Sequence, residues 1–122
     1  GGSVRLLGFR SDVRRLIAAA DVFALASRQE GLPVAVMEAM AGGRPVVAPN
    51  VGGLGQAVTE RSGVLVAPED PVALADTLLT VLSDADLRGR LGTAAVVDAA
   101  RFDVRRAVSE LERIYRRLAV RV

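Results

Sequence analysis

Short apolar runs alternate with helical patterns through the first half of this chain, and the alternation restricts the fold more than any other feature. Four runs have the length and composition of buried strands, at residues 4–7, 22–25, 45–48 and 64–66. Helical patterns at 12–20 and 33–41 separate the first three, and a glycine-rich turn at 51–55 precedes the last. Strands and helices that alternate at these lengths form right-handed crossovers around a parallel sheet. The sequence therefore predicts an α/β fold of three layers (α/β/α) around a short parallel sheet.

The second half of the chain carries only helical patterns. We expect helices at residues 71–82, 84–91, 93–100 and 103–119, so that a helical segment ends the chain. Asp70 is the expected N-cap of the first of these, Gly92 separates the middle two, and Ser11 is the expected N-cap of the earlier helix at 12–20. The 122 residues are 51% hydrophobic and contain no linker, so we expect one compact domain.

The loop after the second predicted strand leads into a helix start that suits an anion. Pro33 fits the first helical turn because its missing N–H would have had no partner there. The free amides of Gly31, Leu32 and Val34 lie at the positive end of the helix dipole. A diphosphate is the kind of group that such a turn binds, and Pro33 would contribute shape without a donor.

Two glutamates bracket this helix start. Glu30 precedes the helix, and Glu38 lies about 7–8 Å along its axis. A carboxylate accepts hydrogen bonds from vicinal hydroxyls but repels phosphate, so one glutamate would suit a sugar and the other a ribose on either side of a diphosphate. The alternative is a glutamate that caps the helix and another that is merely solvated.

The surrounding residues carry a more restrictive pattern. Glu30-Gly-Leu-Pro is followed by Glu38-Ala-Met-Ala and then by Gly42-Gly-Arg-Pro-Val-Val-Ala. This segment resembles the donor-sugar signature of the group 1 family of retaining glycosyltransferases with the GT-B fold. The resemblance implies that residues 1–122 form a Rossmann-like domain for a nucleotide-diphospho-sugar. It also implies that Glu30 contacts the donor sugar at the catalytic centre and that Glu38 contacts the ribose.

Two further loops would meet this site at the carboxyl edge of the sheet, where parallel sheets bind ligands. In the resembling family the loop at Gly8, Phe9 and Arg10 lies near the nucleotide base, although an arginine after a strand is also a common surface residue. The loop with Gly52 and Gly53 resembles a sugar-contacting element, or is simply a flexible turn. It departs from the family pattern, because Gly55 and Gln56 replace a proline and a glutamate.

The resemblance covers only part of the family's architecture. The N-terminal acceptor domain and the first strands of the C-terminal domain, which carry a basic pair for the diphosphate, have no counterpart here. Glycosyl transfer needs a stabilised leaving group and a positioned acceptor hydroxyl. We therefore expect the donor-binding part of a hexosyl-transferring enzyme that acts with retention, and expect this chain alone to be inactive. The alternative is a Rossmann-like binding or assembly module without catalysis, which would self-associate through an exposed sheet edge.

Composition removes other classes of function. The chain has no cysteine, histidine or lysine, so thiol, imidazole and amine nucleophiles and zinc clusters are excluded, and we expect no metal or cofactor. A net charge of +2 and 3% aromatic residues argue against a nucleic-acid partner. With neither a membrane span nor a signal layout in the sequence, the expected location is cytoplasmic.

The last helical pattern is basic and amphipathic. Apolar residues recur at intervals of three or four while arginines occupy other faces, and the apolar set is Val104, Val108, Leu111, Tyr115, Leu118 and Val122. Such a helix could pack on a protein surface, or lie peripherally on the anionic inner face of a membrane.

Overall fold

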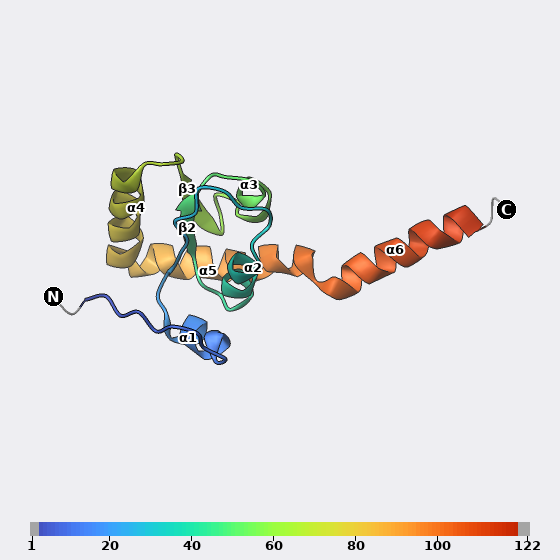
Figure 1. The fold of residues 1–122 in the computed structure, drawn as a ribbon, viewed down its shortest axis with the longest axis horizontal. Helices are drawn as coiled ribbons and strands as arrows, with labels where there is room; N and C mark the ends of the chain where they lie inside the picture. The colour runs from blue at the N-terminus through green and yellow to red at the C-terminus, as the bar shows by residue number, and fades with distance from the viewer. Residues whose placement is uncertain (1–2, 120–122) are drawn as a thin grey trace.

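The computed structural model describes residues 3–119 and confirms an α/β fold around a short parallel sheet (Figure 1). The sheet has three strands in the order β1-β2-β3, namely β1 (Phe23–Ala24), β2 (Val46–Pro49) and β3 (Gly63–Val66). The helices are α1 (Val13–Ala19), α2 (Val34–Ala41), α3 (Leu54–Ala57), α4 (Pro71–Ser83), α5 (Ala85–Ala99) and α6 (Val104–Ala119), and the 3-10 turn η1 (Ala100–Phe102) joins the last two.

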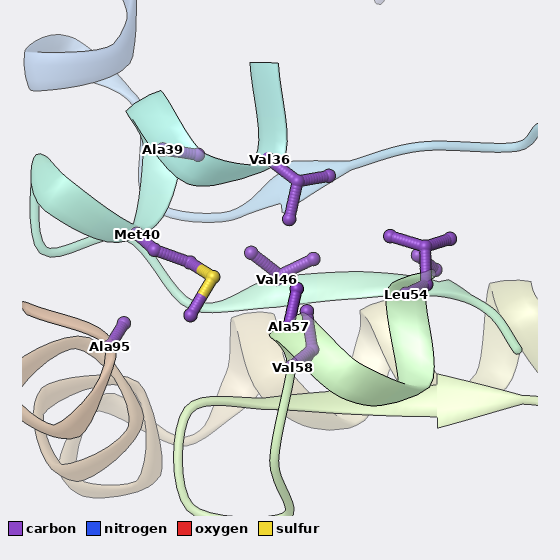
Figure 2. Packing of buried hydrophobic residues seen from close by; sticks show 9 residues of the cluster. Val36, Ala39, Met40, Val46, Leu54, Ala57, Val58 and Ala95 are labelled. Carbon is purple, nitrogen blue, oxygen red and sulfur yellow. The ribbon is translucent and has the colours of Figure 1, made fainter. Parts of the chain in front are cut away.

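The core lies on both faces of β2, whose four residues are all buried. Val46 and Ala48 point to the face that α2 and α3 cover, and Figure 2 shows Val46 between Val36 of α2 and Ala57 of α3. Val47 points to the opposite face, where it packs with Val81 of α4 and Leu91 of α5. Alternate residues of a strand face opposite ways, so an apolar strand needs a helical layer on each side. The three predicted layers follow.

The predicted strand at residues 4–7 is wrong. This segment is irregular and exposed, and 97% of Leu6 is accessible to solvent. A strand needs a neighbour to take its ladder hydrogen bonds. Within residues 3–119 no strand lies beside the free edge of β1 that could pair with it. The apolar pattern alone therefore forms no strand here.

Two details of the helices also differ from the prediction. The helices expected at 84–91 and 93–100 are one helix, α5, with Gly92 inside it. A Cβ on Gly92 would lie 2.3 Å from the Gly43 carbonyl oxygen, so this glycine permits close packing of α5 on the end of α2. Asp12, not Ser11, is the N-cap of α1. The Asp70 cap is confirmed, because Oδ1 of Asp70 accepts a 2.8 Å hydrogen bond from the Ala73 amide.

Helix α6 extends away from the sheet and its covering helices (Figure 1). It has no buried residue, and the apolar set from Val104 to Leu118 is exposed along it. Val122, the last member of the predicted set, lies outside the residues that the structure describes. No helix in residues 3–119 combines the length and the apolar character needed to cross a bilayer.

Candidate functional site at the carboxyl edge of the sheet

The structure brings two of the predicted loops into direct contact. The loop that contains Glu30 and Gly31 follows β1, and the loop that contains Gly52 and Gly53 follows β2. Parallel pairing of β1 with β2 places both loops at the same edge of the sheet. The Gly53 amide donates a 2.7 Å hydrogen bond to the Gly31 carbonyl oxygen. The sheet therefore fixes the Glu30 loop against the glycine loop.

Glycine is required at both contact positions. Gly52 has φ +54°, and a Cβ there would lie 1.6 Å from the Glu30 carbonyl oxygen. A Cβ on Gly53 would lie 2.6 Å from the Gly31 carbonyl oxygen. Real Cβ atoms do not approach a carbonyl this closely, so a side chain at either position would push the loops apart.

A hydroxyl group that the sequence analysis missed holds the Glu30 carboxylate. Ser27 Oγ donates a 2.5 Å hydrogen bond to Glu30 Oε1, and both side chains are partly buried. No protein group within residues 3–119 bonds the other carboxylate oxygen. The available signal was a serine three residues before the glutamate in a strand-end loop, a spacing that permits a local side-chain contact. Ser27 fixes one oxygen of Glu30 and leaves the second available to accept from a ligand.

The first turn of α2 has open backbone donors beside Glu30. Pro33 is the N-cap, and no side chain caps this turn. In the part of the chain that the structure describes, the amides of Gly31 and Leu32 have no protein hydrogen-bond partner. Leu32 and Val34 are exposed, and Glu38 is partly buried farther along α2. The turn therefore offers donors and the positive end of a helix to an anion.

The surface around Glu30 is hollowed on two sides. One open hollow is lined by backbone and side chains of both loops, namely Arg28, Gln29, Glu30, Gly31, Val51 and Gly52. The neighbouring cavity, about 330 Å³, crosses the ends of all three strands, and Ser27, Arg28 and Glu69 are among its lining residues. Arg28 Nε lies 3.7 Å from Glu69 Oε1, and both side chains are highly exposed. Screening by water makes such an exposed pair weak, so Arg28 is available to a ligand.

The third predicted loop is not joined to the other two. Gly8, Phe9 and Arg10 are exposed, and 97% of Phe9 is accessible to solvent. Arg10 Nη2 lies 2.7 Å from Asp12 Oδ2, and the hydrogen bond from Arg10 lowers the pKa of Asp12. No hydrogen bond or ion pair within residues 3–119 links residues 8–10 to the Glu30 loop. Arg10 is thus a locally paired surface residue in this structure.

Comparisons with known proteins place this arrangement in a family. The family described as glycosyl transferases group 1 matches residues 1–84. A D-inositol 3-phosphate glycosyltransferase of Corynebacterium diphtheriae is 46% identical over 98 residues, which are 80% of this chain and 23% of that protein. An N-acetylgalactosaminyltransferase of Campylobacter jejuni that acts on a diphospho-undecaprenol compound is 34% identical over 84% of this chain and 27% of its own length.

Solved structures agree with the family match. The Anabaena protein HepE in complex with UDP-glucose aligns with a TM-score of 0.82 and 32% identity, over 97% of this chain and 32% of that one. A sucrose-phosphate synthase of Thermosynechococcus elongatus aligns with a TM-score of 0.81 and 32% identity, over 88% of this chain and 27% of its own. The chain thus spans about a quarter of the length of the curated relatives that it matches. From the family match, the contacts at the sheet edge and these alignments, the chain belongs to the group 1 glycosyltransferases, a family with the GT-B fold.

Proposed function

We propose that this chain is the donor-binding part of a glycosyltransferase and binds a nucleotide-diphospho-sugar at the carboxyl edge of its sheet. The observation that carries the proposal is the fixed contact between the Glu30–Gly31 and Gly52–Gly53 loops, beside an uncapped helix start. The complexes of Anabaena HepE with UDP and with UDP-glucose support a ligand of this class.

The chemistry of the site divides the ligand into four parts. The diphosphate lies at the first turn of α2, where the amides of Gly31, Leu32 and Val34 donate. The Glu30 carboxylate, with Ser27 on one oxygen, accepts from the hydroxyls of the sugar. Glu38, about one helical turn beyond the start of α2, accepts from the hydroxyls of the ribose. Gly52 and Gly53 present backbone to the sugar, and Gly8, Phe9 and Arg10 form the base side.

The complete reaction needs more than these residues. We propose that the parent enzyme transfers a hexosyl group to an acceptor hydroxyl with retention and without a metal. The helix start and basic groups from other parts of the parent enzyme would stabilise the departing diphosphate, and an N-terminal domain would supply the acceptor. On this proposal the 122-residue chain binds the donor but transfers no sugar.

Calorimetric titration of the chain with UDP, UDP-glucose, GDP and ADP tests the proposal. Glu30→Gln should weaken binding of UDP-glucose about 10- to 100-fold and leave UDP binding unchanged, because charged hydrogen bonds to the sugar are lost. Glu38→Gln should weaken both ligands. Glu112→Gln on exposed α6 is the matched control and should change neither. Equal loss of affinity for UDP and UDP-glucose in Glu30→Gln would refute the assignment of Glu30 to the sugar.

The free edge of β1 favours a second candidate, a non-catalytic module that assembles through its sheet. Within residues 3–119, β1 pairs with β2 on one side only. An unpaired edge can add a strand from another chain. Sedimentation velocity across a range of concentrations measures this association. A chain that stays monomeric and binds UDP-glucose would exclude the assembly reading.

A further inference from the structure

A polar cluster at the end of α5 holds the turn between α3 and β3. Thr59 Oγ1 donates a 2.6 Å hydrogen bond to Asp98 Oδ2, which joins this turn to α5. The Thr59 amide donates to Ser62 Oγ at 3.0 Å, and Ser62 is fully buried. The hydrogen bond from Thr59 lowers the pKa of Asp98, with a further contribution from Ser62 and from the charges of Arg101 and Arg61. Asp98 is therefore an ionised group at the junction of two elements.

Arg101 contacts the carboxyl end of α3 directly. Its Nη2 donates to the carbonyl oxygen of Ala57 at 3.1 Å and lies 3.4 Å from that of Gln56. These carbonyls are at the carboxyl end of α3, which carries the negative end of the helix dipole. Arg101 Nε also donates to the Asp98 carbonyl oxygen at 3.2 Å. Asp98 thus holds the turn that follows α3, and Arg101 holds the last carbonyl groups of the helix itself.

The other end of α3 is the glycine loop of the donor site. Gly53 is the N-cap of α3 and donates to Gly31. The helix has four residues, about 6 Å of rise, and its Leu54 and Ala57 side chains are completely buried. One short, closely packed helix therefore separates the contacts at its C-terminal end from Gly52 and Gly53.

We propose that Asp98 and Arg101 are positioning residues of the donor site. Acting through α3, they keep Gly52 and Gly53 against the Glu30 loop and so fix the backbone that faces the sugar. The effect on the sugar rests on the proposed function, whereas the effect on the loop contact does not. Neither residue touches the Glu30 loop by any hydrogen bond within residues 3–119.

Hydrogen exchange of the Gly53 amide measures the contact without any ligand. Asp98→Ala should speed exchange at Gly53 at least about tenfold more than at the β2 amides, because the hydrogen bond to Gly31 opens locally. Asp98→Asn keeps an acceptor for Thr59 and should restore most of the protection. If Asp98→Ala folds poorly, Arg101→Ala is the second variant, and it should speed exchange at Gly53 in the same way.

Val81→Ala is the matched control, since Val81 is buried on the opposite face of the sheet. It should lower overall stability and leave the ratio of Gly53 to β2 exchange unchanged. Titration with UDP and UDP-glucose supplies the second readout: Asp98→Ala should reduce the preference for UDP-glucose over UDP about three- to tenfold, and Val81→Ala should not.

An unchanged exchange ratio in both Asp98→Ala and Arg101→Ala would overturn the positioning role, whatever the ligands do. An altered ratio with an unchanged preference for UDP-glucose would overturn its link to the sugar. If the unmodified chain binds neither UDP nor UDP-glucose, the proposed function fails, and the exchange ratio still decides the role of Asp98 and Arg101.

Discussion

The two sides of the candidate site differ sharply in how the structure holds them. On the side assigned to the sugar, the Glu30 and Gly52–Gly53 loops share a backbone hydrogen bond and glycine contacts that leave no room for a Cβ. On the side assigned to the base, Phe9 is 97% exposed and Gly8 has nothing within 4 Å of its Cβ position. Both glycine turns have positive φ, at +54° for Gly52 and +64° for Gly8.

The difference shows that a glycine motif in the sequence does not by itself bring its residues into contact with a neighbouring loop. Glycines with the same backbone conformation occur in both loops, but only the one beside β2 is enclosed by another loop. Because β2 is buried at the centre of the sheet, the loop that follows it has neighbours on several sides. Within residues 3–119, the segment around Gly8 follows no strand, and nothing lies within 4 Å of the Gly8 Cβ position.

The largest expected effect comes from a matched pair of glycine substitutions. Gly52→Ala should cost about 1–3 kcal/mol of unfolding free energy and weaken UDP-glucose binding at least about tenfold, because its Cβ meets the Glu30 carbonyl. Gly8→Ala introduces a Cβ at a similar φ but in open space, so it should cost only the strain of an alanine at positive φ, about 1–2 kcal/mol, and less than Gly52→Ala. Urea denaturation and calorimetry measure both. Equal effects in the two variants would remove the distinction between the loops.

Removing the Ser27 hydroxyl tests the side of the site that is assigned to the sugar, without touching the base side. Ser27→Ala takes away the hydrogen bond that orients the Glu30 carboxylate. Affinity for UDP-glucose should fall about three- to tenfold, while affinity for UDP stays unchanged. Ser109→Ala on exposed α6 is the control substitution. Weaker binding of UDP itself would contradict a role confined to the sugar.

Acid titration tests the contact between Asp98 and Thr59, which we propose positions the glycine loop. The pKa of Asp98 is lowered in the folded chain from its ordinary 3.8, chiefly by the hydrogen bond from Thr59. Its stabilising contribution is therefore present above the ordinary pKa and is lost as the pH falls through the lowered value. Denaturation curves of the unmodified chain and Asp98→Asn should differ at pH 7 and converge as the pH falls through the lowered pKa of Asp98. A constant difference across this range would show that the carboxylate charge is irrelevant.

The smallest effect is expected on the base side. Arg10→Ala breaks only an exposed pair with Asp12, so the unfolding free energy should change by less than about 0.5 kcal/mol. Affinities for UDP and UDP-glucose should fall together, by roughly two- to fivefold, since both ligands contain the base and the diphosphate. Arg117→Ala on α6 is the exposed control. A loss restricted to UDP-glucose would move Arg10 to the sugar side.

Local patterns predicted the elements, and long-range packing decided their details. The strands around Val46 and Val64 and the Asp70 cap were predictable because apolar runs and caps are local. The irregular structure of residues 4–7 was not predictable, since strand formation depends on a neighbour. Gly92 was misread as a break because its reason, the approach to Gly43, lies far away in sequence.

The same division holds for the site. Glu30, Glu38 and the glycines were found from their order along the chain. The contact between Asp98 and Thr59 spans 39 positions, and no local spacing indicates it. Sequence therefore predicts the groups that we propose to face the ligand, whereas a long-range contact such as that of Asp98 with Thr59 is visible only in the fold.

Backbone NMR during titration with UDP-glucose tests the central claim most directly. The account predicts that the amide resonances of Gly31, Leu32, Val34, Gly52 and Gly53 shift with UDP-glucose. UDP alone should shift residues 8–10 and the start of α2 but leave the glycine loop nearly unchanged. Saturable binding that shifts neither the Glu30 loop nor Gly52 and Gly53 would contradict the placement of the donor site at this edge of the sheet.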